Sequence, residues 1–78
     1  MSKKEYETAD RHFQAAIGLG MRDAVLFRYA GDVAVVLEQY ERALQDYNLC
    51  LELAPNNEHV RSVRERIRTM LQQGSVRK

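Results

Sequence analysis

The sequence predicts an all-α fold of about four antiparallel helices in a single domain that spans residues 1–78. Three observations favour this fold. Residues of one kind recur at a constant offset of 34 positions, which is a period of stacked helix pairs. Four segments carry apolar residues at helical spacing. Glycine, proline or asparagine separates them at two of the three junctions. The recurring pairs are Tyr6 and Tyr40, Ala9 and Ala43, Phe13 and Tyr47, Ala16 and Cys50, Ile17 and Leu51, and Leu19 and Leu53.

The first helix is expected over about residues 3–18. Ser2 and Glu5 have the spacing of a capping box, in which each side chain binds the other residue's backbone amide. Apolar residues then recur on one helical face. Gly18 and Gly20 end the helix, because glycine adopts positive φ at little cost.

The second helix is expected over about residues 24–37, with Asp23 as its N-cap. Residues 33–37 are apolar nearly all round, which indicates burial on several sides. The run is rich in β-branched residues, but the 34-residue period assigns it to a helix.

The third helix is expected over about residues 40–53, because Pro55 bars the residue before it from helical geometry. Asn57 then caps a fourth helix over about residues 58–72, which has one apolar and one charged face. Gly74 is expected to close this helix and to leave residues 74–78 as a frayed tail.

Composition excludes several classes of function. The net charge of +1 argues against a protein built mainly to bind nucleic acid, although residues 58–78 alone carry +4. No apolar stretch approaches the ~18 residues of a membrane span. The single cysteine, Cys50, allows no intramolecular disulfide and no Cys/His metal motif. We therefore expect a cytoplasmic protein without metal or cofactor.

Residues 24–57 combine a bulky aromatic residue, small residues at helical spacing, two tyrosines and a closing proline: Phe27, Ala30, Gly31, Ala34, Tyr40, Ala43, Tyr47, Cys50 and Pro55. In these residues the segment resembles one full tetratricopeptide repeat. The resemblance covers the whole chain, in the order second helix, full repeat, first helix, and it implies a right-handed α-α superhelix. Two residues depart from the family pattern: Met21 replaces a proline, and Glu38 occupies a turn that favours glycine and is therefore strained or wound as extra helix.

Small residues at three of these positions, Gly31, Ala43 and Cys50, are expected to let two helix backbones approach closely. Phe27 and Tyr47 would fill the space beside the contact.

The resemblance also implies a function in protein binding, because first helices of this family line a groove for a peptide. Arg28 and Arg66 would hold a carboxylate of the bound peptide, or they are simply solvated charges. Asp32 stands where chaperone-binding relatives have asparagine, which argues against that particular ligand. The groove residues would be Val25, Arg28, Tyr29, Asp32, Val35, His59, Ser62, Arg66 and Thr69.

Two other interactions are alternatives. The first helix corresponds to half a repeat, so the face formed by Tyr6, Ala9, Phe13 and Ala16 could dock a second copy into a homo-oligomer. Arg61, Arg64 and Arg68 form a basic stripe, which is either a solvated face or a weak site for a polyanion.

An enzyme is not expected. His12 and His59 lie on different predicted helices without neighbouring ligands, and Cys50 occupies a packing position without a flanking basic group. No serine, histidine and aspartate arrangement forms a recognisable catalytic set.

Overall fold

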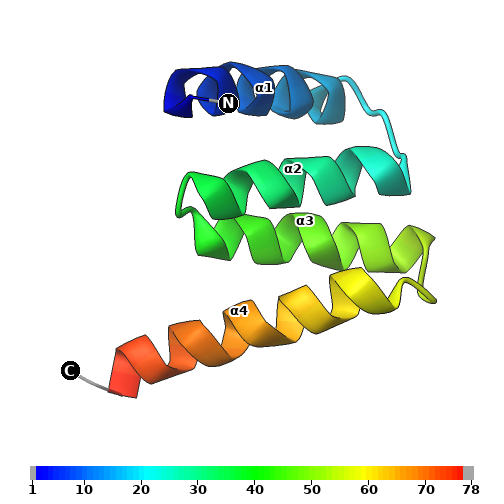
Figure 1. Cartoon of the computed structure of the whole chain (residues 1–78). Coiled ribbons are helices and arrows are strands. Elements are labelled where there is room, and N and C mark those ends of the chain that lie inside the picture. Colours follow the sequence, from blue (N-terminus) through cyan, green and yellow to red (C-terminus); the bar gives the residue numbers. More distant parts are fainter. Residues whose placement is uncertain (1, 77–78) are drawn as a thin grey trace.

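The computed structural model describes residues 2–76. Every regular element within these residues is a helix, which confirms the predicted all-α class, and the four helices stack antiparallel in chain order (Figure 1). They are α1 (Lys3–Gly18), α2 (Ala24–Val36), α3 (Tyr40–Leu53) and α4 (Glu58–Val76).

The bounds of α1 and α3 agree with the sequence prediction, and α2 ends one residue earlier, at Val36. The prediction for the end of the chain was wrong in part, because α4 continues through Gly74 to Val76. A single glycine lowers helix propensity by ~1 kcal/mol without forcing a stop. The last two positions of the expected tail, 77–78, lie outside the described residues.

The predicted N-cap hydrogen bonds are observed at three of the four helix N-termini. Ser2 and Glu5 form the reciprocal capping box, with the Ser2 amide donating to Glu5 Oε1 at 2.7 Å. Asp23 Oδ1 accepts from the Val25 amide at 2.8 Å, and Asn57 Oδ1 accepts from the amide of Val60 at 3.1 Å. These contacts satisfy amides that the helices leave without internal partners.

The core lies at the contact of α2 with α3 and extends to α4. Gly31 faces the ring of Tyr47 so closely that a Cβ on Gly31 would lie 2.6 Å from Tyr47 Cε1. The predicted close approach is observed at Gly31, and Ala43 and Cys50, the other two small residues, are buried in the same core. The Tyr47 hydroxyl donates to Asp32 Oδ1 at 2.5 Å, which gives the buried phenol a partner. The cluster comprises Phe27, Ala34, Ala43, Tyr47, Cys50, Leu51, Val60 and Ile67.

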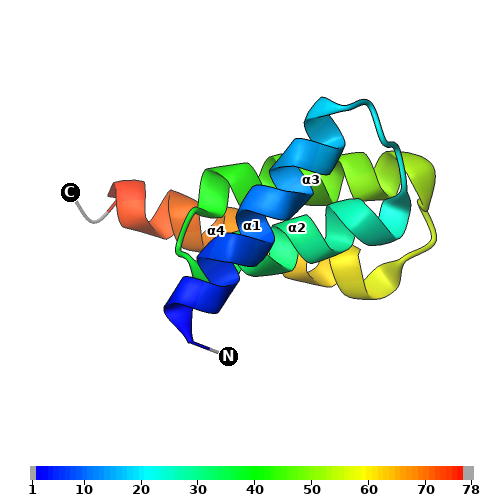
Figure 2. The ribbon, with the colours of Figure 1, turned by 90° about the horizontal axis from the view of Figure 1, so that it is seen from above.

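Each helix packs mainly on its neighbour in the chain: α1 on α2, α2 on α3, and α3 on α4. Viewed from above, α1 crosses α2 obliquely, and it contributes no fully buried residue (Figure 2). Toward its C-terminal end α4 diverges from α3 (Figure 1). The helices are therefore layered in sequence order around the α2–α3 contact.

The turns that follow α1 and α2 have the same hydrogen bonds. After α1, the amides of Gly20 and Met21 bond to Ile17 O at 3.0 Å and to Ala16 O at 3.2 Å. After α2, the amide of Glu38 bonds to Val35 O at 3.0 Å, and the next amide reaches back to Ala34 O at 2.8 Å. Both turns are Schellman motifs, which need a left-handed residue.

Glycine fills the left-handed position after α1, but Glu38 fills it after α2 with φ of 61°. Of the two alternatives for this turn, the strained one is therefore observed. A left-handed residue with a Cβ costs roughly 1–2 kcal/mol.

Gly31→Ala should lower the free energy of unfolding by about 1–3 kcal/mol, because the added methyl would overlap the Tyr47 ring. Gly18→Ala is the matched control, since a Cβ there meets nothing within 4 Å and alanine favours the helix. Urea unfolding of both variants measures the effect. Equal stability of the two variants would contradict the close approach.

Glu38→Gly should raise the free energy of unfolding by ~1 kcal/mol, because glycine relieves the left-handed strain. Glu38→Ala removes the same charge but keeps a Cβ, so it separates strain from electrostatics. Thermal unfolding should show a higher Tm for the glycine variant only; a similar rise with alanine would assign the gain to charge.

Candidate functional site

An apolar stripe remains exposed on α2, formed by two residues of the predicted groove and by Val36. Val25 is 53% exposed, Tyr29 is 45% exposed and Val36 is 48% exposed, and the spacing of four and then seven residues places them on one helical face. Met70 of α4 is 42% exposed. Single exposed apolar residues are ordinary, but an aligned stripe on one helix is a feature of binding surfaces.

Arg28 lies beside this stripe and is held by its neighbour. Its guanidinium carbon lies 4.9 Å from the centre of the Tyr29 ring, a cation–π distance. Its Nε atom is buried, without a hydrogen-bond partner among the described residues. No ion pair joins Arg28 or Arg66 to another residue that the structure describes. Arg28 therefore retains the capacity to bind an anionic group.

The other predicted groove residues divide into two groups. Asp32 accepts the Tyr47 hydroxyl and Val35 packs partly against the core, so both support the fold. The four positions on α4 are exposed, with no contact that would prevent binding: His59, Ser62, Arg66 and Thr69.

The predicted self-association face, Tyr6, Ala9, Phe13 and Ala16, is half-buried. The Phe13 ring stacks on Tyr29 of α2, with centroids 6.4 Å apart and an interplanar angle of 21°. Part of this face therefore already packs within the chain.

Two strongly exposed apolar residues at the α1–α2 turn were not predicted as a site. Leu19 is 85% exposed and Met21 is 54% exposed. One feature of the sequence could have indicated this exposed pair: Met21 stands where the repeat pattern has proline.

The basic stripe of α4 is engaged in contacts within the chain. Arg61 donates to the carbonyl of Pro55 at 2.5 Å, and Arg64 donates to Asn48 Oδ1 at 3.3 Å. Glu65 lies 3.1 Å from Arg64 and 3.5 Å from Arg68. Arg61 and Arg64 thus link α4 to the turn before it and to α3. Arg68 pairs with Glu65 within α4, and Glu65 offsets part of the charge of Arg64 and Arg68.

A charged cluster joins α1 to α3, and sequence reasoning missed it. Arg42 pairs with Asp10 and also donates to Gln39. Asp46 is buried one turn further along α3, and its Oδ2 atom has no hydrogen-bond partner among the described residues. Burial raises the pKa of Asp46 to about 6, although Arg42 opposes the shift, and the charge of Asp10 adds to it.

Two buried titratable groups in the core have low reactivity. Burial raises the pKa of the Cys50 thiol, which disfavours the nucleophilic thiolate. Burial and the hydrogen bond to Asp32 raise the pKa of Tyr47. In residues 2–76 no group of three or more His, Cys, Asp or Glu side chains is placed to hold a metal ion.

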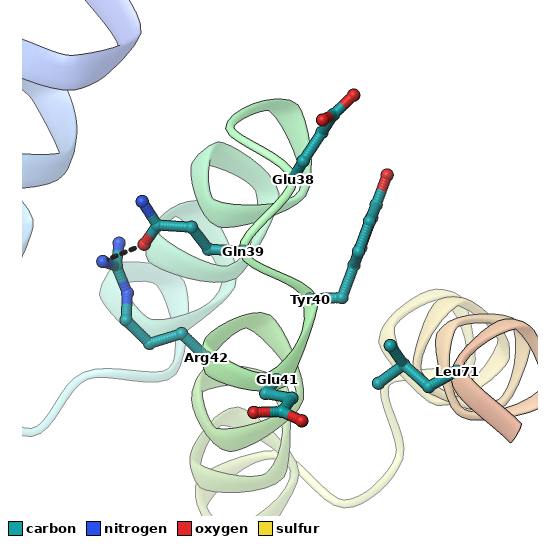
Figure 3. Close-up of a pocket in the computed structure, with 6 residues that line it drawn as sticks. All are labelled: Glu38, Gln39, Tyr40, Glu41, Arg42 and Leu71. Carbon is teal, nitrogen blue, oxygen red and sulfur yellow. Dashed lines mark hydrogen bonds between the residues drawn. The ribbon is translucent and has the colours of Figure 1, made fainter. Parts of the chain in front are cut away.

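A concavity of about 410 Å³ lies between the α2–α3 turn and the C-terminal half of α4. Figure 3 shows that Gln39 and Arg42 bond to each other on the side away from Leu71. Sequence analysis did not predict this hollow, because it depends on the divergence of α4 from α3. The residues around it are Glu38, Gln39, Tyr40, Glu41, Arg42 and Leu71.

Comparisons of the chain with protein-family models, with curated proteins and with solved structures each found no match. Within the described part of the chain, no helix combines the length and apolar character needed to cross a membrane. The class that the structure defines is thus a small four-helix domain with an exposed apolar and cationic surface.

Asp46 should make stability depend on pH. Its pKa is about 6 in the folded state, against an ordinary value of 3.8 in the unfolded chain, so the folded state binds more protons between these values. Proton binding by Asp46 therefore stabilises the folded state fully below pH 3.8, and this contribution to the free energy of unfolding is lost as the pH rises through 6.

Urea unfolding of the wild type and Asp46→Asn between about pH 4 and pH 7 measures this contribution. In the wild type the free energy of unfolding should fall as the pH rises through 6. In Asp46→Asn this fall should be absent. Glu52→Gln, an exposed change on the same helix, should retain it. An identical pH profile for Asp46→Asn would show that Asp46 is not the group responsible.

Proposed function

We propose that this chain is a protein-interaction module of the tetratricopeptide-repeat kind, which binds a peptide or helix of another protein along α2 and α4. The observation that carries the proposal is the exposed stripe of Val25, Tyr29 and Val36 beside Arg28. The opposite side of α2 forms the core, and on this outer side Tyr29 stays 45% exposed although the Phe13 ring stacks on it.

The repeat assignment is supported by local chemistry. Small residues lie at the α2–α3 contact, where the repeat pattern places them. The helices pack in chain order, and a left-handed residue lies in the turn where the pattern favours glycine. The one cysteine is free and buried, which fits a reducing compartment such as the cytoplasm.

The size of the surface limits the affinity. Full burial of a large apolar side chain contributes roughly 1.5–3 kcal/mol. Burial of the exposed halves of four side chains would therefore contribute ~4 kcal/mol. These side chains are Val25, Tyr29, Val36 and Met70. Charge-assisted hydrogen bonds from two arginines would add ~4 kcal/mol. The gross gain of ~8 kcal/mol corresponds to a Kd of about 1 μM, and the entropy lost on association makes this an upper limit of affinity.

The test begins with selection of peptides from a displayed library on the immobilised domain. Binding of each selected peptide is then measured by titration calorimetry. Arg28→Ala combined with Arg66→Ala should weaken binding by about tenfold or more, because charge-assisted hydrogen bonds are lost. The helical circular dichroism of the double variant should match that of the wild type.

Arg11→Ala is the matched control, since Arg11 is an exposed arginine on α1 that is not part of the proposed surface. It should leave the affinity unchanged. Peptides that bind the double variant and the wild type equally, or a double variant that loses its helicity, would defeat the assignment of this surface.

A further inference from the structure

The concavity beside the α2–α3 turn combines acidic, aromatic and aliphatic side chains. Tyr40 stands at the start of α3, between Glu38 and the part of α4 that carries Leu71 (Figure 3). In this view the Tyr40 ring is edge-on, so that one face is turned toward α4. Tyr40 and Leu71 both pack partly against the core, which fixes the two walls.

The charge of this hollow is negative. Glu38 and Glu41 are exposed, and neither forms an ion pair with a residue that the structure describes. Arg42 does not neutralise them, because its guanidinium pairs with Asp10 on the side toward α1. The start of α3 contributes a partial positive charge of about +0.5, which offsets only part of two carboxylates.

We propose that this hollow binds an arginine or lysine side chain of a basic, apolar segment of a partner protein. The aliphatic stem would lie on Leu71, and the cationic head would lie over the face of Tyr40 that is turned toward α4, where the negative charge of the nearby Glu38 and Glu41 attracts it. Arginine is favoured over lysine, because its planar guanidinium both stacks on an aromatic ring and donates forked hydrogen bonds.

The wall chemistry selects a polypeptide side chain over a free hydrated cation. Exposed carboxylates alone attract a small cation weakly, since water screens the interaction. The apolar wall formed by Tyr40 and Leu71 adds stabilisation only for a ligand with an aliphatic stem. This hollow involves none of the residues on the α2 stripe, so the proposal does not depend on the function proposed for that stripe.

The test uses the isotope-labelled chain and the blocked peptide Ac-Ala-Leu-Arg-Leu-Ala-amide, followed by amide chemical shifts. Saturable shifts at residues 38–42 and at Leu71, with a Kd of about 1 mM, are expected for a single anchored side chain. The same peptide with citrulline in place of arginine keeps the shape and removes the charge. It should bind about tenfold more weakly.

Glu38→Gln combined with Glu41→Gln should also weaken the arginine peptide about tenfold, while Glu52→Gln should not. Glutamine retains the Cβ at position 38, so the turn keeps its conformation. Equal binding of the citrulline peptide, or of the double variant, would overturn the proposal. Butylguanidinium that binds as tightly as the peptide would show that the site takes a small cation, and would overturn the polypeptide occupant.

Discussion

The close approach of α2 and α3 at Gly31 and Tyr47 is the constraint on which the rest of the structure depends. A glycine without a side chain lets the Tyr47 ring lie against the α2 backbone, and the hydrogen bond to Asp32 satisfies the phenol hydroxyl. An unmade bond at that buried hydroxyl would cost roughly 1–3 kcal/mol. Because this contact sets one side of α2 inward, it also leaves the Tyr29 side outward. The same α2–α3 contact fixes the orientation of α3, and therefore the side of α3 against which α4 packs.

Most of the fold was predictable because its determinants are local. Helix starts follow from side chains that reach backbone amides within three residues, as Ser2, Asp23 and Asn57 do. Helix ends follow from Gly20 and Pro55, which restrict the backbone at their own positions. The turn at Glu38 left two alternatives open, since sequence alone cannot show whether the surrounding packing forces the left-handed conformation.

The site was predictable only in part, because its contacts depend on how helices cross. Asp10 and Arg42 are 32 positions apart, and they meet through the oblique packing of α1. The hollow between Tyr40 and Leu71 arises where α4 diverges from α3, which no residue spacing reveals. Helical spacing predicted a basic stripe on α4, but side-chain geometry shows that Arg64 is engaged within the chain.

Packing in chain order has a consequence for dynamics. Residues that contact one another are close in sequence, so little loop entropy opposes their meeting, and the chain should fold within microseconds to milliseconds. Since α1 has no fully buried residue, we expect it to open more readily than the α2–α3 pair. Amide hydrogens of α1 should then exchange with solvent much faster than those around Tyr47. The domain would behave as a stable helical pair with a more labile helix at its N-terminal edge.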